Sequence, residues 1–285
     1  MNFLDELQER VLPGDGGMGT ELLAAGAPMG SCLEALNVTQ PDLVSGIHEQ
    51  YIAAGARVIG TNSFGANAVR LARHGLEGRV NELNWNAAQL AKDAAKGKDV
   101  YVAGSVGPLG ITAAEAAAQG IDRHRVYLEQ IGALLDGGCQ LIILETFLDV
   151  DELLIALHAK HTLHHCPVVA LVSATDPASL AAACKKLCEV EADVIGVNCV
   201  DVAMARQSFA SLEMLDGPAR AAFPSAGLPE MRAGRAEYRM TPEAFAAEGR
   251  ALAATGARLI GGCCGIGPGH IRALAAALKP DPAAD

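Results

Sequence analysis

The chain has 285 residues, of which 51% are hydrophobic, and its formal net charge at pH 7 is −11. This length suits a single α/β barrel, and the negative charge argues against nucleic acid or an anionic membrane as the main partner. No apolar run approaches the roughly 20 residues of a transmembrane helix, and residues 1–6 lack the basic region of a secretory signal. We therefore expect a cytoplasmic protein whose eight cysteines are free thiols, metal ligands or buried residues, not a disulfide framework.

Short β-branched runs alternate with longer stretches rich in alanine and leucine along the whole chain. Their periods predict strands that are each followed by a helix. The expected strands are 11–12, 57–64, 100–106, 140–146, 168–173, 193–199, 221–225 and 258–263. The expected helices are 41–54, 80–96, 123–136, 149–163, 177–190, 202–215, 242–255 and 270–278.

Eight strands with helices between them form either a closed barrel or a doubly wound open sheet. The count of eight and the absence of a linker favour a single (β/α)8 TIM-type barrel, one domain over 1–285 with its core at about 10–278. The longest irregular stretches, 26–39, 107–120 and 227–241, follow strand ends. In a barrel such stretches are the loops of the active face.

Residues at the expected helix ends support this division. Thr39 is expected to cap the helix that starts at Pro41, with its hydroxyl accepting a hydrogen bond from a first-turn amide. Thr241 precedes Pro242, and proline is favoured at the first position of a helix, where its missing N–H costs nothing.

The run Gly-Gly-Cys-Cys-Gly at 261–265 is the sharpest chemical signal in the sequence. Side chains alternate between the two faces of a strand, so Cys263 and Cys264 reach one metal only if the flanking glycines let the backbone leave strand geometry. Cys199, at the end of the expected sixth strand, supplies a third sulfur. Three thiolates leave one position open on a tetrahedral zinc, as in catalytic sites. From the residues alone, a buried and unreactive cysteine pair is the alternative.

Other polar residues also lie where expected strands end, and a barrel would bring them together. They are Asp15, Thr61, Asn62, Ser105 and Glu145. Turn chemistry is the alternative role for Asp15, and a structural ion pair is the alternative for Glu145. The glycine spacing at 14–19 fits a dinucleotide-binding loop, but a carboxylate inside that loop would oppose a pyrophosphate.

The cysteine run, with Gly-Val-Asn-Cys upstream at 196–199, resembles the homocysteine S-methyltransferase family. Blocks at 15–20, 61–67, 103–108 and 145–146 match in the same order, so the resemblance covers about residues 10–278. It implies that the three cysteines bind one Zn²⁺, which takes the homocysteine sulfur as its fourth ligand and favours the thiolate. It also implies that Asp15 and Glu145 hold the homocysteine ammonium. The implied substrate-binding residues are Asp15, Gly16, Thr61, Asn62, Ser105 and Glu145, with amides near Ser105 or Gly16 for the carboxylate.

Two loops bear on the methyl donor. Residues 30–33 and 63–66 lack the Trp and Tyr with which betaine-using members of the family grip a quaternary ammonium. Residues 34–41 and 61–67 look closer to the homocysteine module of cobalamin-dependent methionine synthase. We therefore expect homocysteine to be converted to methionine with a methyl group linked to methylcobalamin or methyltetrahydrofolate and delivered by a separate corrinoid protein.

Three alternatives stay open at this point. The donor is a small molecule such as S-methylmethionine or betaine, the acceptor is another small thiol, or the chain is a non-catalytic partner subunit whose zinc only joins strands six and eight. The oligomeric state is left open as well. A cluster at 158–166 with four histidines and a cysteine is interpreted as a solvated helix end on the face opposite the site, and not as a second metal site.

Overall fold

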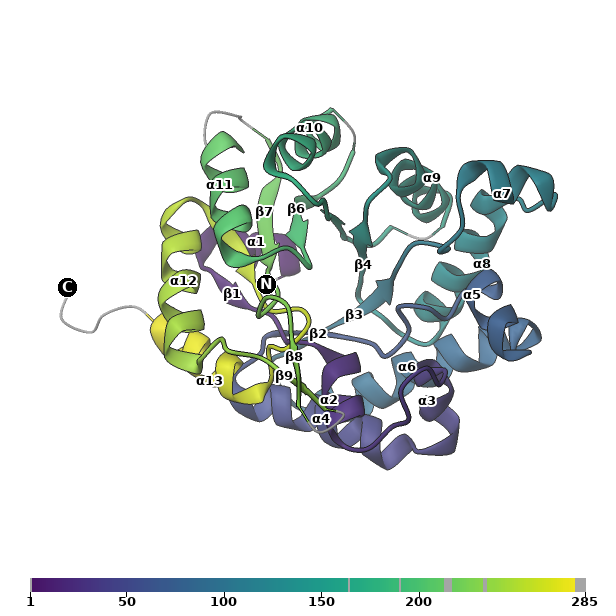
Figure 1. Ribbon diagram of the computed structural model, residues 1–285, viewed down its shortest axis with the longest axis horizontal. Coiled ribbons are helices and arrows are strands. Elements are labelled where there is room, and N and C mark those ends of the chain that lie inside the picture. The colour runs from purple at the N-terminus through teal and green to yellow at the C-terminus, as the bar shows by residue number, and fades with distance from the viewer. Residues whose placement is uncertain (1, 164, 190, 213–216, 233–234, 280–285) are drawn as a thin grey trace.

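Eight parallel strands form one sheet in the computed structural model, which describes residues 2–163, 165–189, 191–212, 217–232 and 235–279. They are β1 (Leu12–Pro13), β2 (Val58–Gly60), β3 (Tyr101–Val106), β4 (Leu141–Phe147), β5 (Val168–Val172), β6 (Val194–Asn198), β7 (Ala219–Phe223) and β10 (Ala257–Ile260). Their spatial order is β1-β10-β7-β6-β5-β4-β3-β2, and a parallel bridge between Gly14 and Val58 joins its two ends. The strands make a nearly closed barrel, which confirms the expected TIM-type α/β fold (Figure 1).

Helices connect the strands and surround the barrel (Figure 1). The eight expected ones are α4 (Pro41–Ala54), α6 (Val80–Ala95), α8 (Arg123–Asp136), α9 (Val150–His161), α10 (Pro177–Cys188), α11 (Val202–Leu212), α12 (Pro242–Ala254) and α13 (Pro268–Ala277). Five short helices were not expected from the sequence, namely α1 (Phe3–Glu9), α2 (Met18–Ala24), α3 (Leu36–Thr39), α5 (Ala68–Leu71) and α7 (Ala113–Ala118). Within the described residues, no helix is long and apolar enough to cross a membrane.

The structure corrects several local predictions. The expected strands 57–64 and 258–263 end early, at Gly60 and Ile260, because the backbone after these residues turns into loops. The stretch 227–241 is not irregular throughout but contains an antiparallel hairpin of β8 (Glu230–Arg232) and β9 (Arg235–Glu237), strands too short and polar to show an apolar pattern.

The helix caps give one correction and one confirmation. Thr39 does not cap α4, because it is the last residue of α3 and its hydroxyl donates back to the carbonyl of Ala35 at 3.1 Å. Thr241 caps α12 as expected, accepting a hydrogen bond from the Ala244 amide at 3.2 Å. Cap residues therefore predict helix starts well only where no second short helix precedes them.

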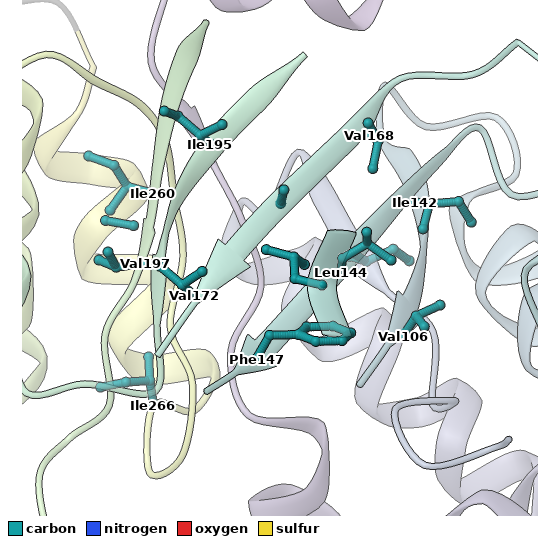
Figure 2. Close-up of a cluster of buried hydrophobic side chains, with 14 of the residues drawn as sticks. Val106, Ile142, Leu144, Phe147, Val168, Val172, Ile195, Val197, Ile260 and Ile266 are labelled. Atoms are coloured by element: carbon teal, nitrogen blue, oxygen red, sulfur yellow. The ribbon is translucent and has the colours of Figure 1, made fainter. Parts of the chain in front are cut away.

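The two faces of each strand build two hydrophobic layers. Outward side chains pack under the helices, and Figure 2 shows part of this layer, including Ile142 and Leu144 of β4. Inward side chains fill the barrel, and from β4 these are Leu141 and Ile143. Because the side-chain period of a strand is two, the next inward position of β4 is Glu145. The same rule that fills the barrel thus delivers polar side chains to its carboxyl end.

Helix α1 closes the opposite end of the barrel. Phe3 and Leu7 are buried in the inner layer. Between them on the sequence lies Glu6, whose carboxylate accepts hydrogen bonds from Arg57 and from the Tyr101 hydroxyl, both at 2.8 Å. Arg10 pairs with the same carboxylate from the next turn. This end is filled and its buried charge is paired, so the polar carboxyl end is where a ligand site is to be sought.

Candidate metal centre

Three cysteine sulfurs meet at the carboxyl end of the barrel. The Sγ atom of Cys264 lies 3.9 Å from that of Cys199 and 3.9 Å from that of Cys263, and all three lie within 4.8 Å of one another. Zinc–sulfur bonds of about 2.3 Å at tetrahedral angles place sulfurs about 3.8 Å apart. The three side chains therefore fit a zinc ion, and the sequence expectation that they converge is met in space.

The cysteine run reaches this position by leaving the strand. Because β10 ends at Ile260, neither Cys263 nor Cys264 lies in regular strand geometry, and the alternation of side chains does not separate them. The Gly262 amide donates to the Asp15 carbonyl at 2.8 Å, and the Cys263 amide donates to the Pro224 carbonyl at 2.9 Å. These backbone bonds hold the run between the loops that follow β1 and β7.

Gly262 and Gly265 are needed for close packing more than for turning the cysteine side chains inward. A Cβ on Gly262 would lie 2.2 Å from the side chain of Ile266, so no larger residue fits there. Gly265 has φ +79°, and a Cβ on it would lie 2.4 Å from the ring of Tyr238. Tyr238, which follows β9, therefore packs on the turn immediately after Cys264. This contact could not be predicted from the sequence, because it joins a loop expected to be irregular with the cysteine run.

Cys199 is placed by a strained backbone. Its φ is +55°, in the left-handed region that non-glycine residues rarely adopt, and its amide donates to the carbonyl of Phe223 at 3.0 Å. Thr146 is the other non-glycine residue with positive φ among those the structure describes, at +61°. Such strain at the carboxyl ends of two strands of one site is typical of a functional constraint.

The three thiols share their protons unequally in the absence of a metal. Hydrogen bonds from Cys199 and Cys263 lower the pKa of Cys264 to about 3, so this sulfur is a thiolate at neutral pH. Hydrogen bonds with Cys199 and Cys264 raise the pKa of Cys263 well above its usual value. Metal binding must therefore displace the protons of the other two thiols, and it will strengthen as the pH rises.

Asp15 is buried at the end of β1, with 7% of its surface exposed. Its carboxylate accepts a hydrogen bond from the Gly60 amide at 2.7 Å, which links the loops after β1 and β2. Burial, together with the negative charge of Glu145, raises the pKa of Asp15 to about 8. Its side chain thus reaches across to β2 and does not close its own turn.

Glu145 lies beside Asp15 at the end of the inward row of β4. Its carboxylate accepts hydrogen bonds from the Ser105 hydroxyl at 2.5 Å and from the Asn198 amide at 3.3 Å. Burial, with the charge of Cys264, raises the pKa of Glu145 to about 7. Within the described part of the chain, no Lys, Arg or His forms an ion pair with Asp15 or Glu145. The structure therefore gives no support to a structural ion pair at Glu145.

The remaining predicted substrate residues surround these carboxylates but are engaged with the protein. The Thr61 hydroxyl lies 2.6 Å from that of Ser63 and accepts a hydrogen bond from the Ser105 amide at 3.0 Å. The Asn62 amide donates to the carbonyl of Leu33 at 2.8 Å and so fastens the loop after α2. Their contact with a substrate stays a prediction.

Gly16 lies where the loop after β1 meets the cysteine loop. A Cβ on it would lie 2.0 Å from the carbonyl oxygen of Ile266, so only glycine lets the two loops approach. Asn198, which the sequence places at the end of the sixth strand directly before Cys199 but which was not among the predicted substrate residues, is fully buried and touches Glu145 directly.

The histidine cluster expected to be a solvated helix end does not join this site. His158 and His161 lie on α9 and His165 follows it, and all three are exposed, whereas His164 lies outside the described residues. No cluster of potential metal ligands other than the three cysteines occurs among the residues that the structure describes.

Comparison with known sequences identifies the family. The homocysteine S-methyltransferase profile matches residues 12–278. The methionine synthase of Mycobacterium tuberculosis is 34% identical over an alignment that covers 97% of this chain and 25% of the relative. For the methionine synthase of Mycobacterium leprae the identity is 32% with the same coverage. The chain thus spans about a quarter of the length of these relatives.

Solved structures agree with the sequence comparison. The metallated form of the homocysteine methyltransferase MmuM from Escherichia coli superposes with a TM-score of 0.79 and 26% identity, covering 96% of this chain and 99% of that one. A methyltransferase from Methanosarcina mazei shares the fold, with a TM-score of 0.62 at 11% identity. The chain therefore belongs to the homocysteine S-methyltransferase family, the family of methyltransferase enzymes that its sequence motifs resemble.

Proposed function

We propose that the chain transfers a methyl group to the thiol of L-homocysteine, giving methionine, with one Zn²⁺ held by Cys199, Cys263 and Cys264. One observation carries this proposal. Three sulfurs spaced for a metal lie at the same end of the barrel as two buried carboxylates, those of Asp15 and Glu145, which form no ion pair with a cation among the described residues. A small thiol with an ammonium group is complementary to both halves of this arrangement.

The protein residues bind and orient the substrate in this proposal. Asp15 and Glu145 ionise as the substrate ammonium arrives, because a positive charge between them offsets their mutual repulsion. The Ser105 hydroxyl and the Asn198 amide then fix the direction of the Glu145 carboxylate. A zinc ion bound by the three cysteines supplies a ligand position for the substrate sulfur and lowers its pKa. The thiol proton is lost to solvent, the sulfur forms a bond to the methyl carbon, and the bond between that carbon and the donor breaks.

For the donor we propose a methyl group linked to cobalamin or folate and presented by another protein or domain. The support is the 34% identity to a methionine synthase four times as long as this chain. A second observation weighs against a cationic small donor. The guanidinium carbon of Arg70 lies 4.9 Å from the centroid of the Phe64 ring, so this chain's own cation already occupies that aromatic face.

X-ray absorption at the zinc edge, with and without L-homocysteine, tests the acceptor. We expect three sulfur neighbours in the zinc-loaded chain and four after L-homocysteine is added. A sulfur count that ignores homocysteine would contradict the proposal and favour a structural metal. Methionine formation is then assayed with methylcobalamin, methyltetrahydrofolate, S-methylmethionine and betaine, and activity with either of the last two alone would overturn the proposed donor.

A thiol without an amino-acid end, such as 1-butanethiol, distinguishes the proposed acceptor from other thiols. We expect Asp15→Asn and Glu145→Gln to weaken the binding of homocysteine and to leave the binding of butanethiol unchanged. Equal effects on both thiols would mean that the carboxylates do not hold an ammonium, and the acceptor would have to be sought among other thiols.

A further inference from the structure

Asn198 occupies a central position between the two halves of the site. It is fully buried at the inward end of β6, directly before Cys199 in the sequence. Its neighbours in the site, Thr146 and Cys199, are the two described non-glycine residues with positive φ. The side chain of Asn198 contacts Thr146, and its backbone is joined to Cys199 by a peptide bond.

The side chain of Asn198 uses both of its polar atoms on the last residues of β4. Its Oδ1 accepts a hydrogen bond from the Thr146 amide at 2.7 Å. Its Nδ2 donates to the Thr146 hydroxyl at 2.7 Å and to the Glu145 carboxylate at 3.3 Å. One amide group therefore holds the left-handed conformation of Thr146 and the direction of the Glu145 carboxylate together.

These hydrogen bonds cross from β6 to β4, which are not neighbours in the sheet because β5 lies between them. Adjacent strands are kept in register by their backbone, but β4 and β6 have no such direct connection. The amide of Asn198 thus fixes the position of Glu145 relative to Cys199 at the point where the barrel opens.

We propose that Asn198 is a positioning residue that sets the separation between the ammonium-binding carboxylate of Glu145 and the metal-binding sulfur of Cys199. This inference rests on the proposed function, because it gives each end of homocysteine one of these two partners. A fixed separation selects the length of the substrate. Homocysteine has one methylene more than cysteine between its sulfur and its ammonium, so the same amide sets the preference for homocysteine over cysteine.

The test measures thiol binding to protein loaded with Co²⁺ in place of zinc, through the cobalt–thiolate charge-transfer absorption. L-Homocysteine, L-cysteine and 1-butanethiol are titrated into the parent protein and into Asn198→Ala. We expect Kd for homocysteine to rise about 10- to 100-fold, the range found for residues that orient a metal site's ligands by hydrogen bonds without touching the metal. Kd for butanethiol should not change, and the preference for homocysteine over cysteine should fall.

A second pair of variants separates positioning from folding. Glycine adopts the left-handed conformation without penalty, so Thr146→Gly in the Asn198→Ala background relieves the strain but leaves Glu145 without its hydrogen bond from residue 198. We expect this double variant to regain thermal stability but not homocysteine affinity. Thr146→Gly alone is the matched control, and Asn198→Asp, which keeps the shape but repels Glu145, should also weaken homocysteine binding.

Two results would overturn the inference. Full recovery of homocysteine affinity in the double variant would mean that Asn198 only stabilises the left-handed backbone of Thr146. An equal rise in Kd for all three thiols would mean that Asn198 only stabilises the metal-binding cysteines. A failure of the proposed function looks different, because the parent protein itself would then bind homocysteine no better than butanethiol.

Discussion

The two ends of the barrel treat buried carboxylates in opposite ways. At the end closed by α1, Glu6 accepts hydrogen bonds from Arg57, Arg10 and Tyr101. Burial alone would raise the pKa of Glu6, but these hydrogen bonds and the two positive charges hold it below its usual value. At the open end, burial and the neighbouring negative charge raise the pKa of Asp15 to about 8, and no cation of the described residues pairs with it.

The two ends therefore differ in whether a buried carboxylate stabilises the ligand-free fold. A buried carboxylate with cation partners contributes to folding, whereas one without them destabilises the protein until a ligand supplies the charge. By this criterion we assign the closed end to folding and propose the open end as the binding site. The unpaired pair of carboxylates is informative because the closed end shows that the same chain pairs a buried carboxylate where it serves folding.

Removing a carboxylate at the open end should give the largest effect. We expect Glu145→Gln to lower kcat/KM for homocysteine by about 100- to 1000-fold, because an ammonium buried against one remaining carboxylate loses a charged partner. The thermal stability of the ligand-free protein should stay the same or rise. Steady-state kinetics and thermal unfolding of the same preparation measure both quantities. A fall in Tm with unchanged kinetics would mean that Glu145 serves folding and not substrate binding, and that the two ends do not differ as proposed.

At the closed end the pattern should reverse. We expect Glu6→Gln to lower the free energy of unfolding by about 2 kcal/mol, because Arg57 loses its buried partner and keeps only the exposed Asp99 as an ion-pair partner. The activity per folded molecule should not change. Denaturant unfolding and kinetics below the transition measure the two effects.

An exposed ion pair provides the control for Glu6. Arg79 and Glu82 form such a pair on the surface, and Glu82→Gln should leave stability unchanged because solvent screens it. A loss of activity in Glu6→Gln without loss of stability would contradict the assignment of the closed end to folding.

The sequence predicts much of this contrast, but not all of it. The period of two in β4, running Leu141, Ile143 and Glu145, predicts that a carboxylate reaches the open end of the barrel. The motif at 261–265 predicts the metal ligands, which then meet in space. These features are local or repeat along the chain, so one sequence suffices to find them.

The remaining features depend on contacts between distant segments. The hydrogen bond between Asn198 and Thr146 joins residues 52 positions apart, across an intervening strand. The left-handed conformation of Cys199 belongs to a residue type with no preference for it. Likewise, Tyr238 packs on Gly265 from a hairpin whose short strands carry no apolar pattern. Such contacts are set by tertiary packing, and propensity does not reveal them.

One more buried titratable group, a histidine, has to be substituted before the pH dependence of stability at the two ends can be compared. His48 of α4 is completely buried, and neither ring nitrogen has a hydrogen-bond partner among the described residues. Burial lowers the pKa of His48 to about 4, from an ordinary value of 6.5. The folded state therefore favours the neutral ring, and stability falls as the pH drops from 6.5 to 4, by of order 3 kcal/mol in total.

We expect His48→Leu to remove this loss of stability in acid while changing stability at pH 7 by less than about 1 kcal/mol, because no hydrogen bond is lost. Urea unfolding at pH 4, 5.5 and 7 measures it. An unchanged acid limb would mean that His48 is hydrated or protonated in the folded protein.

In the His48→Leu background the two ends should show opposite pH signatures. The folded pKa of Glu145 is raised from 4.5 to about 7, so its contribution to the stability of metal-free protein is complete below pH 4.5 and is lost as the pH rises through 7. The folded pKa of Glu6 is lowered, so its contribution is present above pH 4.5 and is lost as the pH falls through that lower value. Glu145→Gln should flatten the stability curve between pH 4.5 and 7 by about 3 kcal/mol, and Glu6→Gln should flatten only the part of the curve below pH 4.5. If both substitutions flatten the same limb, the two carboxylates share one electrostatic environment, and pairing with cations no longer separates the structural end of the barrel from the binding end.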